Sequence, residues 1–197
     1  MVLAAIAGLF VISVGAYYIY AKAAGNFHAI SSGQAYRSGQ LNKDQLKYYI
    51  NKFNLKSILN LQGKNSGAEW YRDEVNVCAT YDIMHYYLRL ASRREPRDDE
   101  LEQLVHILNS APRPILIHCK DGADRTGLAA AIWKVAMDKE PEFKAWKQFS
   151  IFYGHFSYGK AGAMDRGFRR WLKTFYTDVN CKENPGLDNG LPERSKT

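Results

Sequence analysis

One short stretch in the second half of the chain combines a thiol, an arginine and several small residues. It contains, in order, His118, Cys119, Lys120, Asp121, Gly122, Ala123, Asp124, Arg125, Thr126 and Gly127. The apolar run 115–117 precedes it, and an Ala-rich segment, 126–137, follows it. This order predicts a loop that leads from a buried strand into the N-terminus of a helix.

Such a loop is suited to binding an anion, because backbone N–H groups and the helix dipole both point at the bound group. The same amides and Arg125 would stabilise the Cys119 thiolate and make it a nucleophile near neutral pH. The planar guanidinium of Arg125 suits bidentate contact with a phosphoryl group. Thr126 can donate its hydroxyl hydrogen to the thiolate. The predicted substrate-binding residues all lie in this loop: Lys120, Asp121, Gly122, Ala123 and Thr126.

The pattern His-Cys-x5-Arg-Thr-Gly resembles the signature of the cysteine-dependent protein tyrosine phosphatase superfamily, and the short chain is similar to its compact dual-specificity branch. The resemblance covers 27–176, and residues 36–40 resemble a stretch near the start of compact bacterial and fungal members. It implies that Cys119 attacks phosphorus, that a general acid protonates the leaving oxygen and that water hydrolyses the cysteinyl-phosphate. It implies no metal and no cofactor, and it gives His118 the role of ordering the loop.

The resemblance leaves the general acid open among three carboxylates. The family usually supplies it from a loop some tens of residues before the cysteine, where this chain has Glu95 and Asp98. Asp99 and Glu102 are spaced as a capping pair for the following helix, and Asp98 lies beside this pair. If both Asp residues serve as caps, Glu95 is the carboxylate of this loop that is left to act as the acid. The third candidate is Asp124, because the loop shares both Asp positions with myotubularin-type phosphoinositide phosphatases. Asp124 could instead only order the loop.

Alternating strands and helices predict an α/β fold with a central, mainly parallel sheet flanked by helices, and with an N-terminal hydrophobic helix. The resemblance implies that this fold is dual-specificity phosphatase-like. The predicted strands are 34–38 at the sheet edge, 55–61, 81–90 and 115–117. The predicted helices are 42–53 with Asn42 as its N-cap, 69–79, 98–108, 126–137, 142–151 and 163–176. Gln148 and His155 could approach the loop from the C-terminal helices.

The chain of 197 residues is divided into three parts by its composition. Residues 1–24 are predicted to be a membrane anchor or, alternatively, a cleaved signal peptide. No charge occurs in 2–20, and a helix of that length would span about 28 Å. The phosphatase domain is predicted over 25–178, and 179–197 is expected to be a polar, disordered tail. The catalytic domain is expected outside the cytosol, periplasmic if the source is bacterial.

Composition and net charge indicate which classes of partner the chain can bind. A hydrophobic fraction of 46% and a net charge of +7 indicate a globular chain with a basic surface, which favours anionic partners. Phosphotyrosine in proteins is the expected substrate, and an anionic phospholipid or inositol phosphate is the alternative. Lys120, Arg93 and Arg94 could contact a second anionic group. No nucleic-acid partner is expected, and the oligomeric state is left open.

The remaining cysteines do not indicate a metal site. Three cysteines are too few for a disulfide-stapled scaffold and too scattered for zinc. Cys78 is predicted to lie in the core, and it could pair with Cys181 only if the domain is exported.

Overall fold

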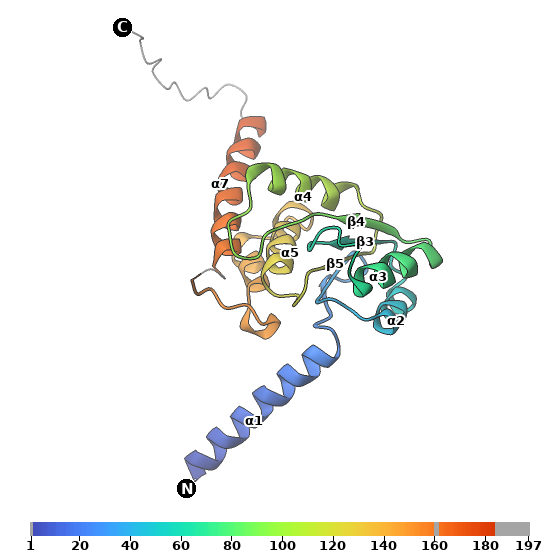
Figure 1. The fold of residues 1–197 in the computed structure, drawn as a ribbon. Coiled ribbons are helices and arrows are strands. Elements are labelled where there is room, and N and C mark those ends of the chain that lie inside the picture. Colours follow the sequence, from blue (N-terminus) through green and yellow to red (C-terminus); the bar gives the residue numbers. More distant parts are fainter. Residues whose placement is uncertain (1, 160–161, 184–197) are drawn as a thin grey trace.

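The computed structural model describes residues 2–159 and 162–183 (Figure 1). The elements in the first half are α1 (Val2–Ala23), β1 (His28–Ser31), β2 (Ala35–Ser38), α2 (Lys43–Phe53), β3 (Ser57–Asn60), α3 (Glu69–Thr80) and β4 (Met84–Tyr87). They are followed by α4 (Asp98–Ser110), β5 (Ile115–His118), α5 (Asp124–Ala136), α6 (Glu142–Ala145), two 3-10 turns at Trp146–Gln148 and Ile151–Tyr153, and α7 (Ala163–Glu183).

The five strands form one sheet in the order β1-β2-β5-β3-β4. Only β1 runs antiparallel, and the other four strands are parallel. Their last residues are in register: Ser38 pairs with His118, His118 with Asn60, and Asn60 with Tyr87. The loop after β5 therefore starts in the middle of the carboxyl edge, where α/β sheets bind their ligands.

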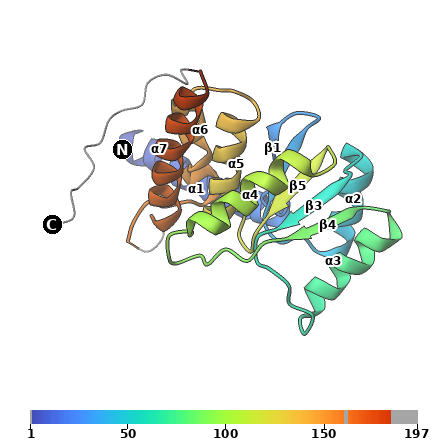
Figure 2. The same cartoon turned by 90° about the horizontal axis from the view of Figure 1, so that it is seen from above.

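Helices cover both faces of this sheet, as Figure 2 shows. Alternate residues of β5 face opposite sides, because side chains in a strand alternate. Ile115 and Ile117 belong to the core beneath α4, α5 and α7, whereas Leu116 belongs to the core beneath α2 and α3. The predicted mixed α/β fold with a mainly parallel sheet flanked by helices is confirmed.

Two elements differ from the prediction. Strand β2 was expected at the sheet edge, but β1 covers its outer side, so β2 is an interior strand. The expected helix 142–151 ends its α-helical turn at Ala145 and continues as two 3-10 turns. The break occurs because Gln148 is drawn into the protein by the guanidinium of Arg37, and Ser150 caps the amide of Phe152 instead of continuing the helix.

The N-termini of α2 and α4 show whether the predicted capping residues are correct. Asn42 caps α2 as predicted, with Gln45 completing a capping box. The predicted capping pair of Asp99 and Glu102 is wrong, because α4 begins at Asp98 and it is Glu100 whose carboxylate accepts the Arg97 amide hydrogen at 2.8 Å. The cap therefore lies two residues earlier than that pair would place it, with Asp98, Asp99 and Glu100 in the first turn of the helix.

The C-terminal part of the chain is helical for longer than predicted. Helix α7 extends to Glu183, into the start of the segment expected to be a disordered tail, and 184–197 lie outside the described residues. Cys78 is buried on α3, and burial raises the pKa of its thiol to about 12. Pairing with Cys181 stays a prediction, because the side chain of Cys181 lies outside the described residues.

Helix α1 projects away from the sheet at the end where the strands finish (Figure 1). Its apolar side chains are exposed, including Leu9, Ile12 and Ile19. Within the part of the chain that is described, no helix has both the length and the apolar composition to cross a membrane. The predicted membrane-spanning helix is therefore not supported by the structure.

Candidate active site

The loop between β5 and α5 turns its carbonyl groups outward. The carbonyl of Lys120 accepts from the Gln40 amide at 3.0 Å, and that of Asp121 accepts from Asn26 Nδ2 at 2.9 Å. The Gly122 carbonyl accepts from Arg37 Nη2 at 2.8 Å. Because a trans peptide places each N–H opposite the preceding carbonyl, the amides that follow these carbonyls point to the inside of the loop. The loop is therefore an anion cradle formed by backbone N–H groups.

Two glycines allow this loop to lie directly on β2. Gly122 has a positive φ of 72°, and a Cβ atom there would come within 2.5 Å of the Gly39 backbone nitrogen. A Cβ on Gly39 would in turn lie 3.2 Å from the Lys120 carbonyl oxygen. The backbone cannot move aside as a flexible side chain can. The close contact between the loop and the end of β2 therefore requires glycine at position 122 and favours glycine at position 39.

Arg37 supports the loop from behind and was not predicted as a site residue. Its side chain is fully buried, and Nη1 donates to both the carbonyl and the side-chain oxygen of Gln148 at 2.9 Å. Its guanidinium also lies 3.9 Å from the centre of the Tyr153 ring. Burial lowers the pKa of Arg37 to about 10, although Tyr153 and Cys119 act to raise it, so the cation persists at neutral pH. Only the resemblance of residues 36–40 pointed to this position.

The predicted nucleophile and its partners lie together at this edge of the sheet. Cys119 is buried at the start of the loop. Arg125 Nη1 donates to the carbonyls of Leu61 at 3.3 Å and Leu90 at 3.4 Å, which hold its guanidinium beside the ends of the neighbouring strands. The Thr126 hydroxyl is buried and has no hydrogen-bond partner within the described chain, so it is available to a group bound in the loop.

Behind Cys119, a buried carboxylate joins two histidines. Glu74 Oε2 lies 2.9 Å from His118 Nε2, within ion-pair distance but not aligned as a hydrogen bond. Its other oxygen, Oε1, is 2.8 Å from both His85 Nε2 and Asn60 Nδ2. Burial alone would raise the pKa of Glu74, but His118 and His85 hold it well below its usual range. Glu74 thus holds His118 in place, and the role of His118 in ordering the loop stays a prediction.

Glu74→Gln is expected to destabilise the protein by about 3 kcal/mol, because it removes the charge that both histidines face in a buried site. Urea unfolding at neutral pH measures the loss. Glu69→Gln is a suitable control, since Glu69 lies on the same helix and is exposed. Equal stability of the Glu74→Gln protein and the wild type would show that Glu74 is not ionised in this network.

The structure gives each candidate acid an ion-pair partner. Glu95 contacts Arg166 Nε at 2.6 Å and Arg170 Nη1 at 2.9 Å, both on α7. Asp98 is largely exposed and lies 3.1 Å from Arg170 Nε. Asp124 Oδ1 lies 2.7 Å from His155 Nδ1. Each would have to exchange its present partner for the leaving oxygen, so which of the three is the acid stays a prediction.

Of the two C-terminal residues suggested from the sequence, His155 reaches the loop, whereas Gln148 reaches only Arg37 behind it. Gln148 binds Arg37, and His155 binds Asp124. His155 also contacts Asp165, at the start of α7, with Nε2 2.8 Å from Oδ1. Of the expected second-anion contacts, Lys120 and Arg93 are exposed, whereas Arg94 already forms an ion pair with Glu100 at 2.6 Å.

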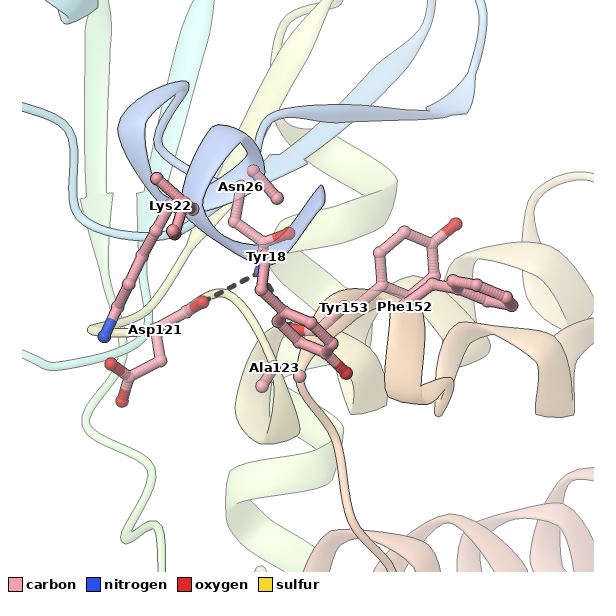
Figure 3. Close-up of a pocket in the computed structure, with 10 residues that line it drawn as sticks. Tyr18, Lys22, Asn26, Asp121, Ala123, Phe152 and Tyr153 are labelled. Atoms are coloured by element: carbon pink, nitrogen blue, oxygen red, sulfur yellow. Dashed lines mark hydrogen bonds between the residues drawn. The ribbon is translucent and has the colours of Figure 1, made fainter. Parts of the chain in front are cut away.

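A cavity of about 440 Å³ adjoins the loop on the side of α1. Figure 3 shows Asn26 hydrogen-bonded to the carbonyls of both Asp121 and Tyr153, with the side chains of Tyr18, Phe152 and Tyr153 also lining the space. The cavity thus has a polar wall formed by the loop and an aromatic wall formed by α1 and the second 3-10 turn.

Comparisons with known proteins agree with this geometry. The sequence matches the tyrosine phosphatase family over residues 23–186. Inositol diphosphatase SIW14 of Saccharomyces cerevisiae is 29% identical over 168 residues. The match covers 81% of this chain and 54% of that protein, so the chain spans about half the length of this curated relative.

Solved structures share the fold. The core catalytic domain of the yeast SIW14 protein, in complex with citrate, has a TM-score of 0.60 at 24% identity, covering 83% of this chain and 94% of that one. P. aeruginosa TpbA has a TM-score of 0.57 at 23% identity, covering 72% and 84%. PTPMT1 in complex with PI(5)P has a TM-score of 0.53 at 12% identity, covering 75% and 97%.

Proposed function

The chain belongs to the tyrosine phosphatase family, and we propose that it hydrolyses phosphomonoesters through a cysteinyl-phosphate intermediate. The Cys119 thiolate attacks phosphorus, the bond to the leaving oxygen breaks, and a carboxylic acid gives that oxygen its proton. Water then attacks the cysteinyl-phosphate and gives its proton to the carboxylate, which releases orthophosphate and restores both the thiolate and the carboxylic acid. Arg125 and the loop amides bind the non-bridging oxygens throughout.

The observation that carries this proposal is the outward orientation of the loop carbonyls. Donors from three other segments hold the carbonyls of Lys120, Asp121 and Gly122, so the amides between Cys119 and Arg125 stay directed inward before any ligand arrives. Preorganised donors of this kind stabilise the charge that develops on a transferring phosphoryl group.

Phosphotyrosine in proteins is the first substrate we propose. The support is the aromatic wall of Tyr18, Phe152 and Tyr153 beside the loop, which a planar side chain could contact. Basic charge on the chain favours an anionic peptide in the same way.

An anionic phospholipid or inositol phosphate is the second candidate. It is favoured by the position of α1, which leaves the domain at the same end of the sheet as the loop (Figure 1). Asn26, just after α1, donates directly to the loop at Asp121. Any surface that received α1 would lie close to the site. The inositol diphosphatase activity of the yeast relative supports the same class.

Membrane association through 2–20, with the catalytic domain outside the cytosol, is a separate proposal that rests on the uncharged sequence of this segment. Flotation of the full chain with lipid vesicles tests association. Protection of the domain from protease added to spheroplasts, together with cleavage after the inner membrane is opened, would contradict only the proposed location.

Phosphate release by the full chain tests the function and the substrate together. Phosphotyrosine peptide, phosphoserine peptide, phosphoinositide, phosphatidylglycerol phosphate and an inositol diphosphate are compared at equal concentration, with Cys119→Ser as control. We expect phosphotyrosine to give the highest kcat/KM. A higher value for the lipid or inositol substrates would select the second candidate, and no release from any of them would contradict the function.

A further inference from the structure

The loop presents an electrostatic problem, because it binds an anion yet carries two carboxylates. Asp121 is exposed, so water screens its charge. Asp124 is less exposed and lies next to Arg125 in the first turn of α5. An uncompensated carboxylate at Asp124 would repel a phosphoryl dianion and would weaken the attraction exerted by Arg125.

His155 lies where it can remove this charge. It is 1% exposed, and its two ring nitrogens face two carboxylates from different helices. Nδ1 is 2.7 Å from Asp124 Oδ1, and Nε2 is 2.8 Å from Asp165 Oδ1. Nδ1 is hydrogen-bonded to Asp124, whereas Asp165 lies within ion-pair distance of Nε2 but is not aligned as a hydrogen bond. Two carboxylates this close to one buried ring favour its protonated form, the imidazolium.

The groups packed around the ring favour this charged form. The Ser157 hydroxyl oxygen lies 3.2 Å from Nε2, and the Phe149 ring packs at 5.1 Å between centroids. Burial acts to lower the pKa of His155, but Asp124 and Asp165 raise it to about 9. The charge of Arg169 on α7 also acts to lower the pKa of Asp165 and so helps to keep it ionised.

We propose that His155 is a positioning residue that neutralises Asp124 and so allows an acidic residue to occupy an anion-binding loop. The inference rests on the proposed function, because the charge of Asp124 matters only if the loop binds a phosphoryl group. A structural crosslink alone would hold α5 against α7 but would not change the affinity for anions through charge. The two roles therefore separate in a double-mutant cycle.

The cycle uses equilibrium binding of tungstate, an oxyanion probe, to the full chain at neutral pH. The variants are His155→Asn, Asp124→Asn and the double variant. Asparagine at 155 keeps an N–H donor for Asp124 and removes the positive charge. We expect His155→Asn to weaken tungstate binding by about 10-fold, and Asp124→Asn to restore most of that loss. His106→Asn, on the exposed side of α4, is the matched control and is expected to bind like wild type.

Two outcomes would overturn the proposal: wild-type affinity in His155→Asn, or a double variant as weak as His155→Asn alone. Failure of the wild type to bind tungstate would instead contradict the proposed function. The experiment measures binding affinity and not turnover. A role of Asp124 as the general acid therefore does not affect the result.

If His155→Asn does not fold, the pH dependence of tungstate binding tests the same proposal. The titration uses the Cys119→Ser chain, so that the binding loop carries no thiol. The His155 cation is present well below pH 9 and is lost as pH rises through about 9, so tungstate affinity should fall over that range. Adding Asp124→Asn should abolish the fall. A fall of equal size with and without Asp124 would contradict the proposal.

Discussion

Replacing Cys119 with serine is expected to lower kcat by roughly 10⁴-fold or more, because the attacking atom is lost while the anion cradle remains. Serine is close to cysteine in size, and the loop is held by Arg37, Asn26 and Gln40 rather than by the thiol. The variant should therefore still bind tungstate. Phosphate release measures the loss, and acid quenching of the wild type during turnover should trap a phosphorylated cysteine.

Arg125→Lys is the companion variant, since it keeps the charge and removes the planar fork. Removing one oriented donor from a transition-state site costs about 10²- to 10³-fold in kcat, and we expect a loss in this range. Arg93→Lys, in an exposed loop position, is the control. Retained turnover in Cys119→Ser would rule out the covalent intermediate, whereas retained turnover in Arg125→Lys would rule out bidentate contact only.

The parts of the site that sequence reasoning found are contiguous in the chain. Cys119, Gly122 and Arg125 lie within one loop, and the strand before it and the helix after it have strong apolar patterns. Such local patterns determine secondary structure directly, because alternation and helical spacing decide which side chains are buried. The cap at Asn42 was predictable for the same reason, since its partner Gln45 is three residues away.

The supporting residues could not be found in this way, because each acts through a partner far along the chain. Arg37 binds Gln148, Asp124 binds His155, and Glu74 contacts His118. No periodicity links such pairs, and only the fold brings them together. Strand β1 was missed for a related reason: its four residues have no alternating pattern, and pairing with β2 is what makes them a strand.

In the loop before α4, the identity of the general acid depends on contacts between residues that are far apart in the sequence. Pro96 packs against Gly167 of α7, and its carbonyl accepts from Arg170. Arg170 also contacts Glu95 and Asp98, so a single side chain of α7 holds two of the three candidate acids. A variant that removes either carboxylate also loosens the loop. The experiment must therefore separate loss of a proton donor from loss of an attachment.

The true general acid is expected to reveal itself by a dependence on the leaving group. Glu95→Gln, Asp98→Asn and Asp124→Asn are compared on aryl phosphates whose leaving phenols differ in pKa. Loss of the acid should lower kcat by about 10²- to 10⁴-fold for a poor leaving group and far less for a good one, which departs without a proton. One of the three variants should show this pattern.

The double variant Arg166→Gln/Arg170→Gln is the matched control for the two carboxylates before α4, because it breaks the same ion pairs and leaves both acids in place. If Glu95 serves only to attach the loop, Glu95→Gln and the double arginine variant should cause equal losses that do not vary with the leaving group. If Glu95 is the acid, the double arginine variant frees it and should preserve kcat. His155→Asn plays the corresponding part for Asp124. The absence of leaving-group dependence in all three carboxylate variants would show that the proton comes from elsewhere.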